Sequence, residues 1–311
     1  MSTPVKQYVT CYSDPDLDGY ACVHAYSEYL NAIGKKTIPG IFGRRNKEVD
    51  FVLDEFSITN LKNFSNLSGK QVILVDSSET IGIDPTLDPA NVVEIIDHRR
   101  INDAHKFPNA KLQIELVGSA ATLVAEKYTG SKTTISRESA ALLYSAILSN
   151  TLNLRAKVTT DRDRKAADWL NGILELDENY VWQMFAAKSD MTGTNLKSSI
   201  IQDFTHFVFG GKKVGIGQLE LVGAESLIQN RKDEMLKIIK DLKNSRGLDH
   251  IFLSVIDLKQ YRNLFISEDN QIREIISKVL GVNFDKNLAE REGFIMRKEM
   301  VPLIKPFFEA N

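Results

Sequence analysis

Two aspartates, Asp16 and Asp18, lie two residues apart in the segment 12–19, which reads Tyr-Ser-Asp-Pro-Asp-Leu-Asp-Gly. The apolar stretch 8–12 before them is typical of a buried strand, and residues 20–33 after them are typical of a helix. The carboxylates therefore lie at the carboxyl end of a strand, where open α/β sheets place their ligand sites. Carboxylates this close repel one another unless cations lie between them, so the pair indicates metal-assisted chemistry.

Two more polar groups follow predicted strands in the same way. Asp76 comes directly after the apolar run 72–75, and Asp97 and His98 come directly after the run 92–96. The carboxyl ends of parallel strands lie along one edge of a sheet, so these side chains can meet there. Taken singly, an aspartate at a strand end is a common turn residue or helix cap. Three such strand-end motifs in succession favour a single site to which all of them contribute.

The donor types specify the chemistry that such a site could perform. Carboxylate oxygens and an imidazole nitrogen suit Mn²⁺, Mg²⁺ or a similar ion. Two such ions a few ångströms apart would bridge a phosphoryl oxygen and activate a water molecule.

The elements that must position these residues alternate between strands and helices in the first half of the chain. The β-branched apolar runs are typical of parallel strands buried on both faces. Helices are predicted over 119–128, from an N-cap at Ser136 through 147, and after the capping-box pair Thr160 and Asp163.

The second half has a different pattern of predicted strands and helices, which indicates a second domain. Strands are expected over 212–221 and 250–258, with an amphipathic helix over 232–244 between them. Near the end, a strand that starts at Gly293 is expected to carry Arg297. We predict an N-terminal parallel-sheet domain and a smaller C-terminal α/β domain, with these boundaries: 1–188, linker 189–196 and 197–311.

Bulk composition excludes several classes of partner. The chain has 311 residues, of which 43% are hydrophobic and 26% charged, and its formal net charge is −2. No global basic field favours nucleic acid, and no apolar run approaches the roughly 18–20 residues that span a bilayer. Only two cysteines, Cys11 and Cys22, are present, which is typical of a reducing compartment. With no signal-peptide core at the N-terminus, we expect a cytoplasmic protein.

These motifs together resemble the DHH phosphoesterase superfamily. The first Asp-x-Asp motif, the second aspartate and the third motif, which is named for Asp-His-His, are matched by Asp16-Leu17-Asp18, Asp76 and Asp97-His98-Arg99. Residues 118–122 resemble the Gly-x-x-x-Thr helix start of the family, and residues 146–151 resemble its fourth motif. The second half is similar to the substrate domain of family II inorganic pyrophosphatases, exopolyphosphatases and prune-type proteins. There, residues 297–302 resemble a phosphate-binding Arg-Lys-x-x-Val-Pro motif.

The chain departs from the pyrophosphatase pattern at five positions, one of which is Met296, where a serine often precedes the Arg-Lys pair. Tyr12 stands where pyrophosphatases place a metal-binding histidine, and Arg99 stands where they place the second histidine of Asp-His-His, as in prune-type proteins. Asn150 replaces an aspartate ligand, and Thr205 aligns with a substrate-binding lysine. A neutral phenol is a poor metal ligand, and the guanidinium of Arg99 is a fixed positive charge with a planar set of donors.

The resemblance implies a role for each matching residue. Four are expected to bind metal, with Asp76 bridging two ions: Asp16, Asp18, Asp76 and His98. Asn150 is expected to be a weak ligand or to orient water. Arg99, Arg297 and Lys298 are expected to bind substrate and to stabilise charge on the phosphoryl group. The expected cofactor is Mn²⁺, with Mg²⁺ or Co²⁺ as alternatives.

The implied reaction is hydrolysis of a phosphoanhydride by metal-activated water, most simply pyrophosphate to two phosphates, with the C-terminal domain closing over the metal centre. Two alternatives stay open. The chain could act on polyphosphate or a nucleotide, or it could be a phosphate-binding regulatory protein that has lost most turnover. We expect a small phosphate-containing substrate and, from the resemblance, a homodimer.

Overall fold

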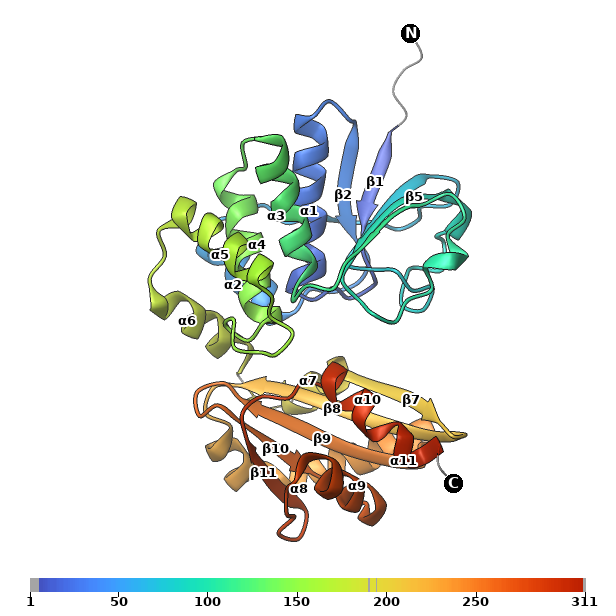
Figure 1. Ribbon diagram of the computed structural model, residues 1–311, viewed down its shortest axis with the longest axis vertical. Helices are drawn as coiled ribbons and strands as arrows, with labels where there is room; N and C mark the ends of the chain where they lie inside the picture. The colour runs from blue at the N-terminus through green and yellow to red at the C-terminus, as the bar shows by residue number, and fades with distance from the viewer. Residues whose placement is uncertain (1–5, 190, 194, 310–311) are drawn as a thin grey trace. The chain divides into compact units, whose positions relative to one another are not determined.

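The computed structural model describes residues 6–189, 191–193 and 195–309. The chain divides into two compact units, one ending at Met184 and the other starting at Phe185. Each has its own sheet and helices (Figure 1). Two residues of the predicted linker, 190 and 194, lie outside the described residues. Met191, from the same segment, packs into the core of the second unit.

The first unit is built on a six-stranded sheet in the order β3-β2-β1-β4-β5-β6. Every pair of neighbouring strands is parallel, which confirms the predicted parallel sheet. Residues Val72 to Val75 are all fully buried, as expected of a strand covered on both faces. The strands are β1 Gln7–Thr10, β2 Thr37–Ile41, β3 Lys62–Asn63, β4 Gln71–Val75, β5 Val92–Asp97 and β6 Lys111–Ile114.

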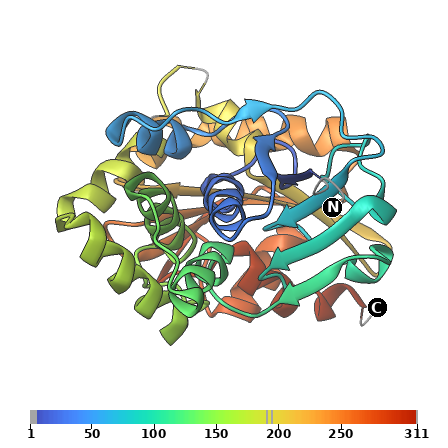
Figure 2. The same ribbon diagram turned by 90° about the horizontal axis from the view of Figure 1, so that it is seen from above.

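Helices cover one face of this sheet. Helix α1 contacts β1, β2 and β4 on one side and α3 and α4 on the other; Figure 2 looks along it. The opposite face packs against loops and two short 3₁₀ segments through a cluster that includes Phe42, Leu74 and Phe107. The helices are α1 Leu17–Ala32, α2 Lys47–Glu55, α3 Ala120–Ser131, α4 Arg137–Asn150, α5 Asp161–Leu174 and α6 Glu178–Lys188, and the 3₁₀ segments are Pro89–Asn91 and Ala104–Lys106.

The predicted helix starts are confirmed. Ser136 caps α4, and Thr160 forms a capping box with Asp163 at the start of α5. Asp163 has a second role, because its fully buried carboxylate also accepts hydrogen bonds from the Gly118 amide and the Thr122 hydroxyl. One carboxylate therefore joins the start of α5 to the start of α3.

The second unit contains a five-stranded sheet in the order β11-β10-β9-β8-β7. Strands β8 and β9 are parallel, and the other pairs are antiparallel. The strands are β7 Phe204–Phe209, β8 Lys212–Leu221, β9 His250–Asp257, β10 Arg262–Ile266 and β11 Leu288–Glu292. The helices are α7 Asn195–Gln202, α8 Ala224–Arg246, α9 Asn270–Leu280, α10 Arg297–Ile304 and α11 Pro306–Glu309.

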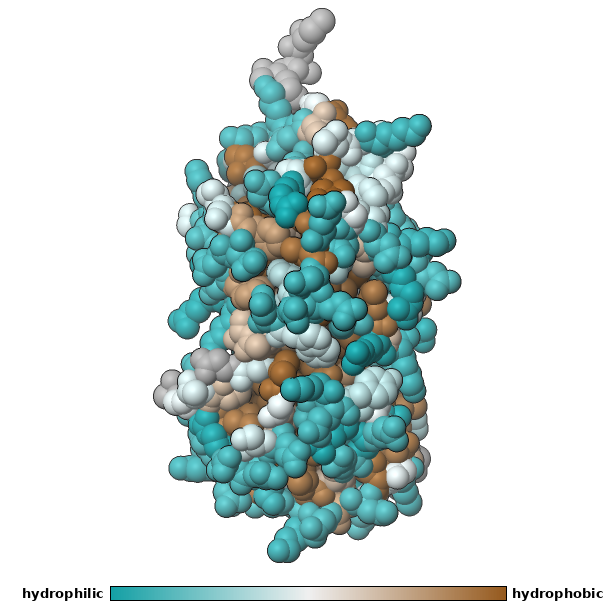
Figure 3. All heavy atoms as spheres, turned by 90° about the vertical axis from the view of Figure 1, so that its left-hand side faces the viewer, coloured by the Kyte–Doolittle hydropathy of each residue, from teal (hydrophilic) through white to brown (hydrophobic). Residues whose placement is uncertain are grey.

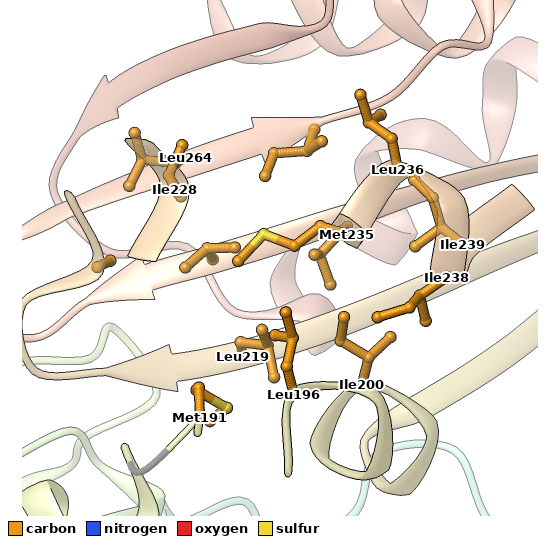
Figure 4. Packing of buried hydrophobic residues seen from close by; sticks show 14 of the residues in the cluster. Met191, Leu196, Ile200, Leu219, Ile228, Met235, Leu236, Ile238, Ile239 and Leu264 are labelled. Atoms are coloured by element: carbon orange, nitrogen blue, oxygen red, sulfur yellow. The ribbon is translucent and has the colours of Figure 1, made fainter. Parts of the chain in front are cut away.

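Each face of this second sheet has its own hydrophobic core. Leu253 and its neighbours on one face pack against α7 and α8, as Figure 4 shows for Leu196, Met235 and Ile239. Phe252, next along the same strand, points to the other face, where α9, α10 and α11 pack. This alternation follows from the two-residue period of a strand.

The predicted strand leading into Arg297 is wrong. Strand β11 ends at Glu292, and Gly293 takes a left-handed conformation with φ of 80°. Arg297 instead begins helix α10, because Glu299 in the first turn reaches back to accept a hydrogen bond from the Met296 amide at 2.8 Å.

The surface is mixed. On the face in Figure 3, hydrophilic residues predominate, with hydrophobic residues scattered among them. No helix in the described part of the chain combines the length and apolar character that crossing a membrane requires.

Replacing Asp163 by alanine should destabilise the first unit. The substitution removes a helix cap and leaves the buried Gly118 amide without its acceptor, which together should cost roughly 2–4 kcal/mol in the free energy of unfolding. Urea denaturation measures this loss. Asp161→Ala, at an exposed position two residues earlier, is the control and should cost under about 0.5 kcal/mol. Equal effects of the two substitutions would contradict the role given to Asp163.

Candidate metal centre

Three neighbouring strands bring three predicted ligands together. The order β1-β4-β5 places the loop after β1, Asp76 after β4 and His98 after β5 along one edge of the sheet. Asp18, Asp76 and His98 each offer a ligand atom, and these atoms lie within 4.8 Å of one another. Both aspartates are buried. We call these three residues the Asp-Asp-His cluster.

The imidazole of His98 is oriented by a backbone carbonyl. Its Nδ1 lies 3.0 Å from the carbonyl oxygen of Val117, and because a carbonyl can only accept, Nδ1 must carry the proton. A neutral ring then presents the lone pair of Nε2 to the cluster. Nε2 lies 3.4 Å from Asp76 Oδ1 and 3.8 Å from Asp18 Oδ2. This is the arrangement that fixes the ligating nitrogen in metal-binding histidines.

The carboxylate of Asp18 is held at the start of helix α3. It accepts hydrogen bonds from the Ser119 hydroxyl at 2.8 Å and from the amides of Ala120 and Ala121, both at 2.9 Å. The positive end of the helix dipole and these donors stabilise the negative charge. Burial nevertheless raises the pKa of Asp18.

The carboxylate of Asp76 has fewer stabilising hydrogen bonds than that of Asp18. Its Oδ1 is buried and has no hydrogen-bond partner among the described residues. Burial raises the pKa of Asp76 to about 7; Arg99 acts to lower it and Asp18 to raise it. The residue also has a left-handed backbone, with φ of 50°, and its amide donates to the carbonyl of Ile96 at 2.7 Å. The Oδ1 atom of Asp76, which accepts no hydrogen bond within the described part of the chain, and the adjacent imidazole nitrogen form part of a coordination shell that a cation would complete.

The cluster fits one divalent cation. Two ligand atoms bound to the same ion at about 2.1 Å lie roughly 3.0 Å apart when adjacent and about 4.2 Å apart when opposite. The separations of 3.4 and 3.8 Å from His98 Nε2 to the two carboxylates fall within that range. Two carboxylates also balance the charge of one divalent ion, and this mixed nitrogen and oxygen set suits Mn²⁺.

Arg99 turns toward the cluster. Its Nη1 donates to the carbonyl oxygen of Asp76 at 2.7 Å, and its Nη2 lies 3.6 Å from Asp76 Oδ1. Nη1 also lies 3.6 Å from Asp97 Oδ2, and the guanidinium carbon lies 5.2 Å from the ring centroid of Tyr12. Burial acts to lower the pKa of Arg99, but the two carboxylates raise it, so the group stays charged.

Asp16 has a different environment from the other predicted ligands. Its Oδ1 caps helix α1 by accepting from the amides of Asp18 and Gly19 at 2.9 and 3.0 Å, and its own amide donates to the Tyr12 hydroxyl. Asp14, in the same loop, accepts from the amide of Arg44 at 2.6 Å. The structure therefore places Asp16 beside the Asp-Asp-His cluster and outside the group of three.

Asn150 touches the cluster through its nitrogen. Its Nδ2 donates to Asp18 Oδ2, so the amide holds the Asp18 carboxylate in place. Sequence reasoning expected a weak ligand or a water-orienting group here. An aspartate at this position could not donate, which gives the asparagine a function of its own.

The predicted phosphate-binding pair lies in the second unit. Arg297 is half-buried at the start of α10, and its Nη2 lies 2.6 Å from Asp203 Oδ1. Its Nη1 also donates to the carbonyl oxygen of Asp203 at 2.8 Å. Lys298, next in the helix, is exposed. Asp203 thus fixes the direction of the Arg297 guanidinium.

Sequence reasoning missed part of the support for the cluster. The segment 118–122 was noted as a helix start, but the donation by Ser119 and the next two amides to Asp18 was not foreseen. Nor was the contact of Val117 with His98. The one available signal was a small-residue helix start with a serine N-cap, which leaves amides available for an anion.

Family comparisons agree with this geometry. The family model of the DHH family, N-terminal domain, matches residues 6–147, and that of the DHHA2 domain matches residues 182–307. A protein of Clostridium acetobutylicum named "Probable manganese-dependent inorganic pyrophosphatase" is 30% identical over 94% of this chain and 95% of its own length. A "Manganese-dependent inorganic pyrophosphatase" of Methanothrix thermoacetophila has the same identity and coverage.

A solved structure extends the likeness to three dimensions. It bears the name "Methanococcus jannaschii putative family II inorganic pyrophosphatase" and superposes with a TM-score of 0.80 at 29% identity. The match covers 97% of this chain and 99% of that one. The chain therefore belongs to the DHH family, as a protein with DHH and DHHA2 domains that is related over nearly its whole length to the manganese-dependent inorganic pyrophosphatases.

Proposed function

We propose that this protein is a manganese-dependent hydrolase that cleaves a phosphoanhydride, with pyrophosphate as its substrate and two phosphates as its products. The observation that carries the proposal is the Asp-Asp-His cluster, in which a buried carboxylate oxygen of Asp76 that accepts no hydrogen bond from the described residues lies 3.4 Å from His98 Nε2. The names of the relatives supply the metal and the substrate class.

Asp18, Asp76 and His98 would hold the metal, with Asp16 beside them as a further candidate. A bound divalent cation would polarise a phosphoryl oxygen and lower the pKa of a water molecule. Val117 keeps His98 in the tautomer that can bind, and Asn150 keeps Asp18 in place.

Arg99, Arg297 and Lys298 are the candidates for contact with the phosphates. Arginine offers planar paired donors, and lysine offers a compact charge. Positive groups aimed at the phosphoryl oxygens would stabilise the charge that develops in the transition state. The proposal also includes a homodimer, which the family resemblance implies, and a cytoplasmic location, which the composition of the chain favours.

Phosphate release from pyrophosphate with Mn²⁺ tests the function directly. The panel should include tripolyphosphate, long-chain polyphosphate and cyclic nucleotides, and we expect pyrophosphate to have the highest kcat/KM. Asp76→Asn keeps the shape of the side chain but removes a ligand charge, and should lower kcat at least about a thousandfold. Asp54→Asn, at an exposed position, is the matched control.

Preference for polyphosphate or a nucleotide would replace the proposed substrate and keep the enzyme class. If no substrate is turned over faster than by Asp76→Asn, the chain is a binding protein and the proposed activity is wrong.

Removing the imidazole should weaken metal binding. His98→Ala deletes one of three ligands and should raise the dissociation constant for Mn²⁺ about a hundredfold or more, since even indirect supports of a site change affinity 10–100-fold. Isothermal titration calorimetry measures the change. His105→Ala, at an exposed histidine, should leave the affinity unchanged. Equal binding by the two variants would remove His98 from the ligand set.

Arg297 should act on substrate affinity. Arg297→Gln removes a charged donor pair and should raise the KM for pyrophosphate roughly 10–100-fold, the effect of losing one charge-assisted hydrogen bond. Steady-state kinetics distinguishes this from a change in kcat. Lys305→Gln, just after the same helix and exposed, is the charge-matched control. An unchanged KM in Arg297→Gln would contradict phosphate binding by this residue.

A further inference from the structure

We propose that the metal centre holds a single divalent cation per chain, and that the guanidinium of Arg99 provides a permanent positive charge in place of a second cation. The inference rests on the proposed function, because it specifies the metal content of the same site. It replaces the two-metal centre that the family resemblance implied.

The contacts of Arg99 place it on the groups that a second ion would need. Asp76 is the carboxylate expected to bridge two metals, and its Oδ1 lies 3.6 Å from Nη2. The backbone carbonyl oxygen of Asp76 accepts a hydrogen bond from Nη1 at 2.7 Å, which holds the guanidinium there. The same Oδ1 lies 3.4 Å from His98 Nε2 on the cluster side. A single oxygen thus faces the first ion and the guanidinium together.

The neighbouring carboxylates are already engaged. Asp97 is fully buried and accepts hydrogen bonds from the Ser78 hydroxyl and from the amide of His98 at 2.7 Å, in addition to its contact with Arg99. Asp16 uses Oδ1 to cap helix α1. Asp97 is thus held by protein donors and by the guanidinium, and Asp16 is committed through Oδ1 to the helix cap.

Tyr12 packs against the guanidinium of Arg99. Its ring lies 5.2 Å from the guanidinium carbon, a distance at which a cation and an aromatic face attract. Its hydroxyl accepts from the amide of Asp16 at 3.2 Å, so the ring has a fixed position. A neutral phenol offers little to a metal ion but stabilises an arginine, so Tyr12 and Arg99 form a matched pair.

The charge count agrees with one ion. In the cluster, Asp18 and Asp76 carry two negative charges and His98 is neutral, which balances one divalent cation. Asp97 supplies a further negative charge, and the guanidinium balances it. Asp16 is left out of this count because it caps helix α1. A second divalent ion would therefore exceed the net negative charge of these five side chains, within a few ångströms of a cation that cannot dissociate or deprotonate.

Metal stoichiometry of the full chain tests this proposal. Equilibrium dialysis against Mn²⁺ followed by elemental analysis should give one ion per chain. Electron paramagnetic resonance of the same sample should show isolated Mn²⁺, without the exchange coupling of a close pair. The double variant Tyr12→His with Arg99→His removes the fixed charge and adds two imidazoles, and should bind a second Mn²⁺ and show exchange coupling. Arg100→Gln, at the exposed neighbouring arginine, should keep one ion.

Two ions per wild-type chain, or none, would overturn the proposal. So would a stoichiometry of one in the double variant with its first site intact, since Arg99 and Tyr12 would then not be what limits the centre. These outcomes are separate from the proposed function. Two ions with rapid pyrophosphate hydrolysis would leave that function standing, whereas one ion without hydrolysis would leave the present inference standing.

Discussion

The burial of Asp18 and Asp76 beside each other is the constraint on which the rest of the first unit depends. Burial disfavours the charged form of both carboxylates, and the charge of Asp18 further raises the pKa of Asp76. A fold that keeps such a pair must surround it with compensating groups. Here they are the amino end of α3 and the guanidinium of Arg99. Oδ1 of Asp76 accepts no hydrogen bond from any residue that the structure describes, so the protein groups leave part of its negative charge unstabilised.

The parallel sheet brings these residues together without long connecting loops. Adjacent strands β1, β4 and β5 end at the same edge, so three short turns bring Asp18, Asp76 and His98 together. The supporting shell depends on more distant packing. Asp163 on α5 fixes Gly118 and Thr122, and these residues flank the donors that hold Asp18. Stability and ligand position are therefore coupled through one buried carboxylate, although Asp163 does not belong to the cluster.

Much of this could be predicted from the sequence, because it follows from local patterns. The apolar runs predicted strands β4 and β5. An aspartate at the end of each run indicated that the candidate site lies at one edge of the sheet. The Thr160 capping box and the Ser136 cap were visible in the same way. Side-chain direction could not be predicted, since it is decided by packing between distant segments. Only the folded structure shows that Arg99 turns toward Asp76 and that the side-chain nitrogen of Asn150 donates to Asp18. The strand expected before Arg297 was wrong because the reach of Glu299 back to Met296 starts a helix there.

The departures from the pyrophosphatase pattern then acquire a physical meaning. Tyr12 and Arg99 support each other, and Asn150 supports Asp18, so the three substitutions describe one altered centre rather than three separate losses. The central claim is that a cation binds between Asp18, Asp76 and His98. The most direct measurement is anomalous diffraction from crystals of the protein grown with Mn²⁺. The account predicts one anomalous peak at about 2.0–2.3 Å from His98 Nε2 and from an oxygen of each aspartate. A peak bound elsewhere, or none at this cluster, would contradict it.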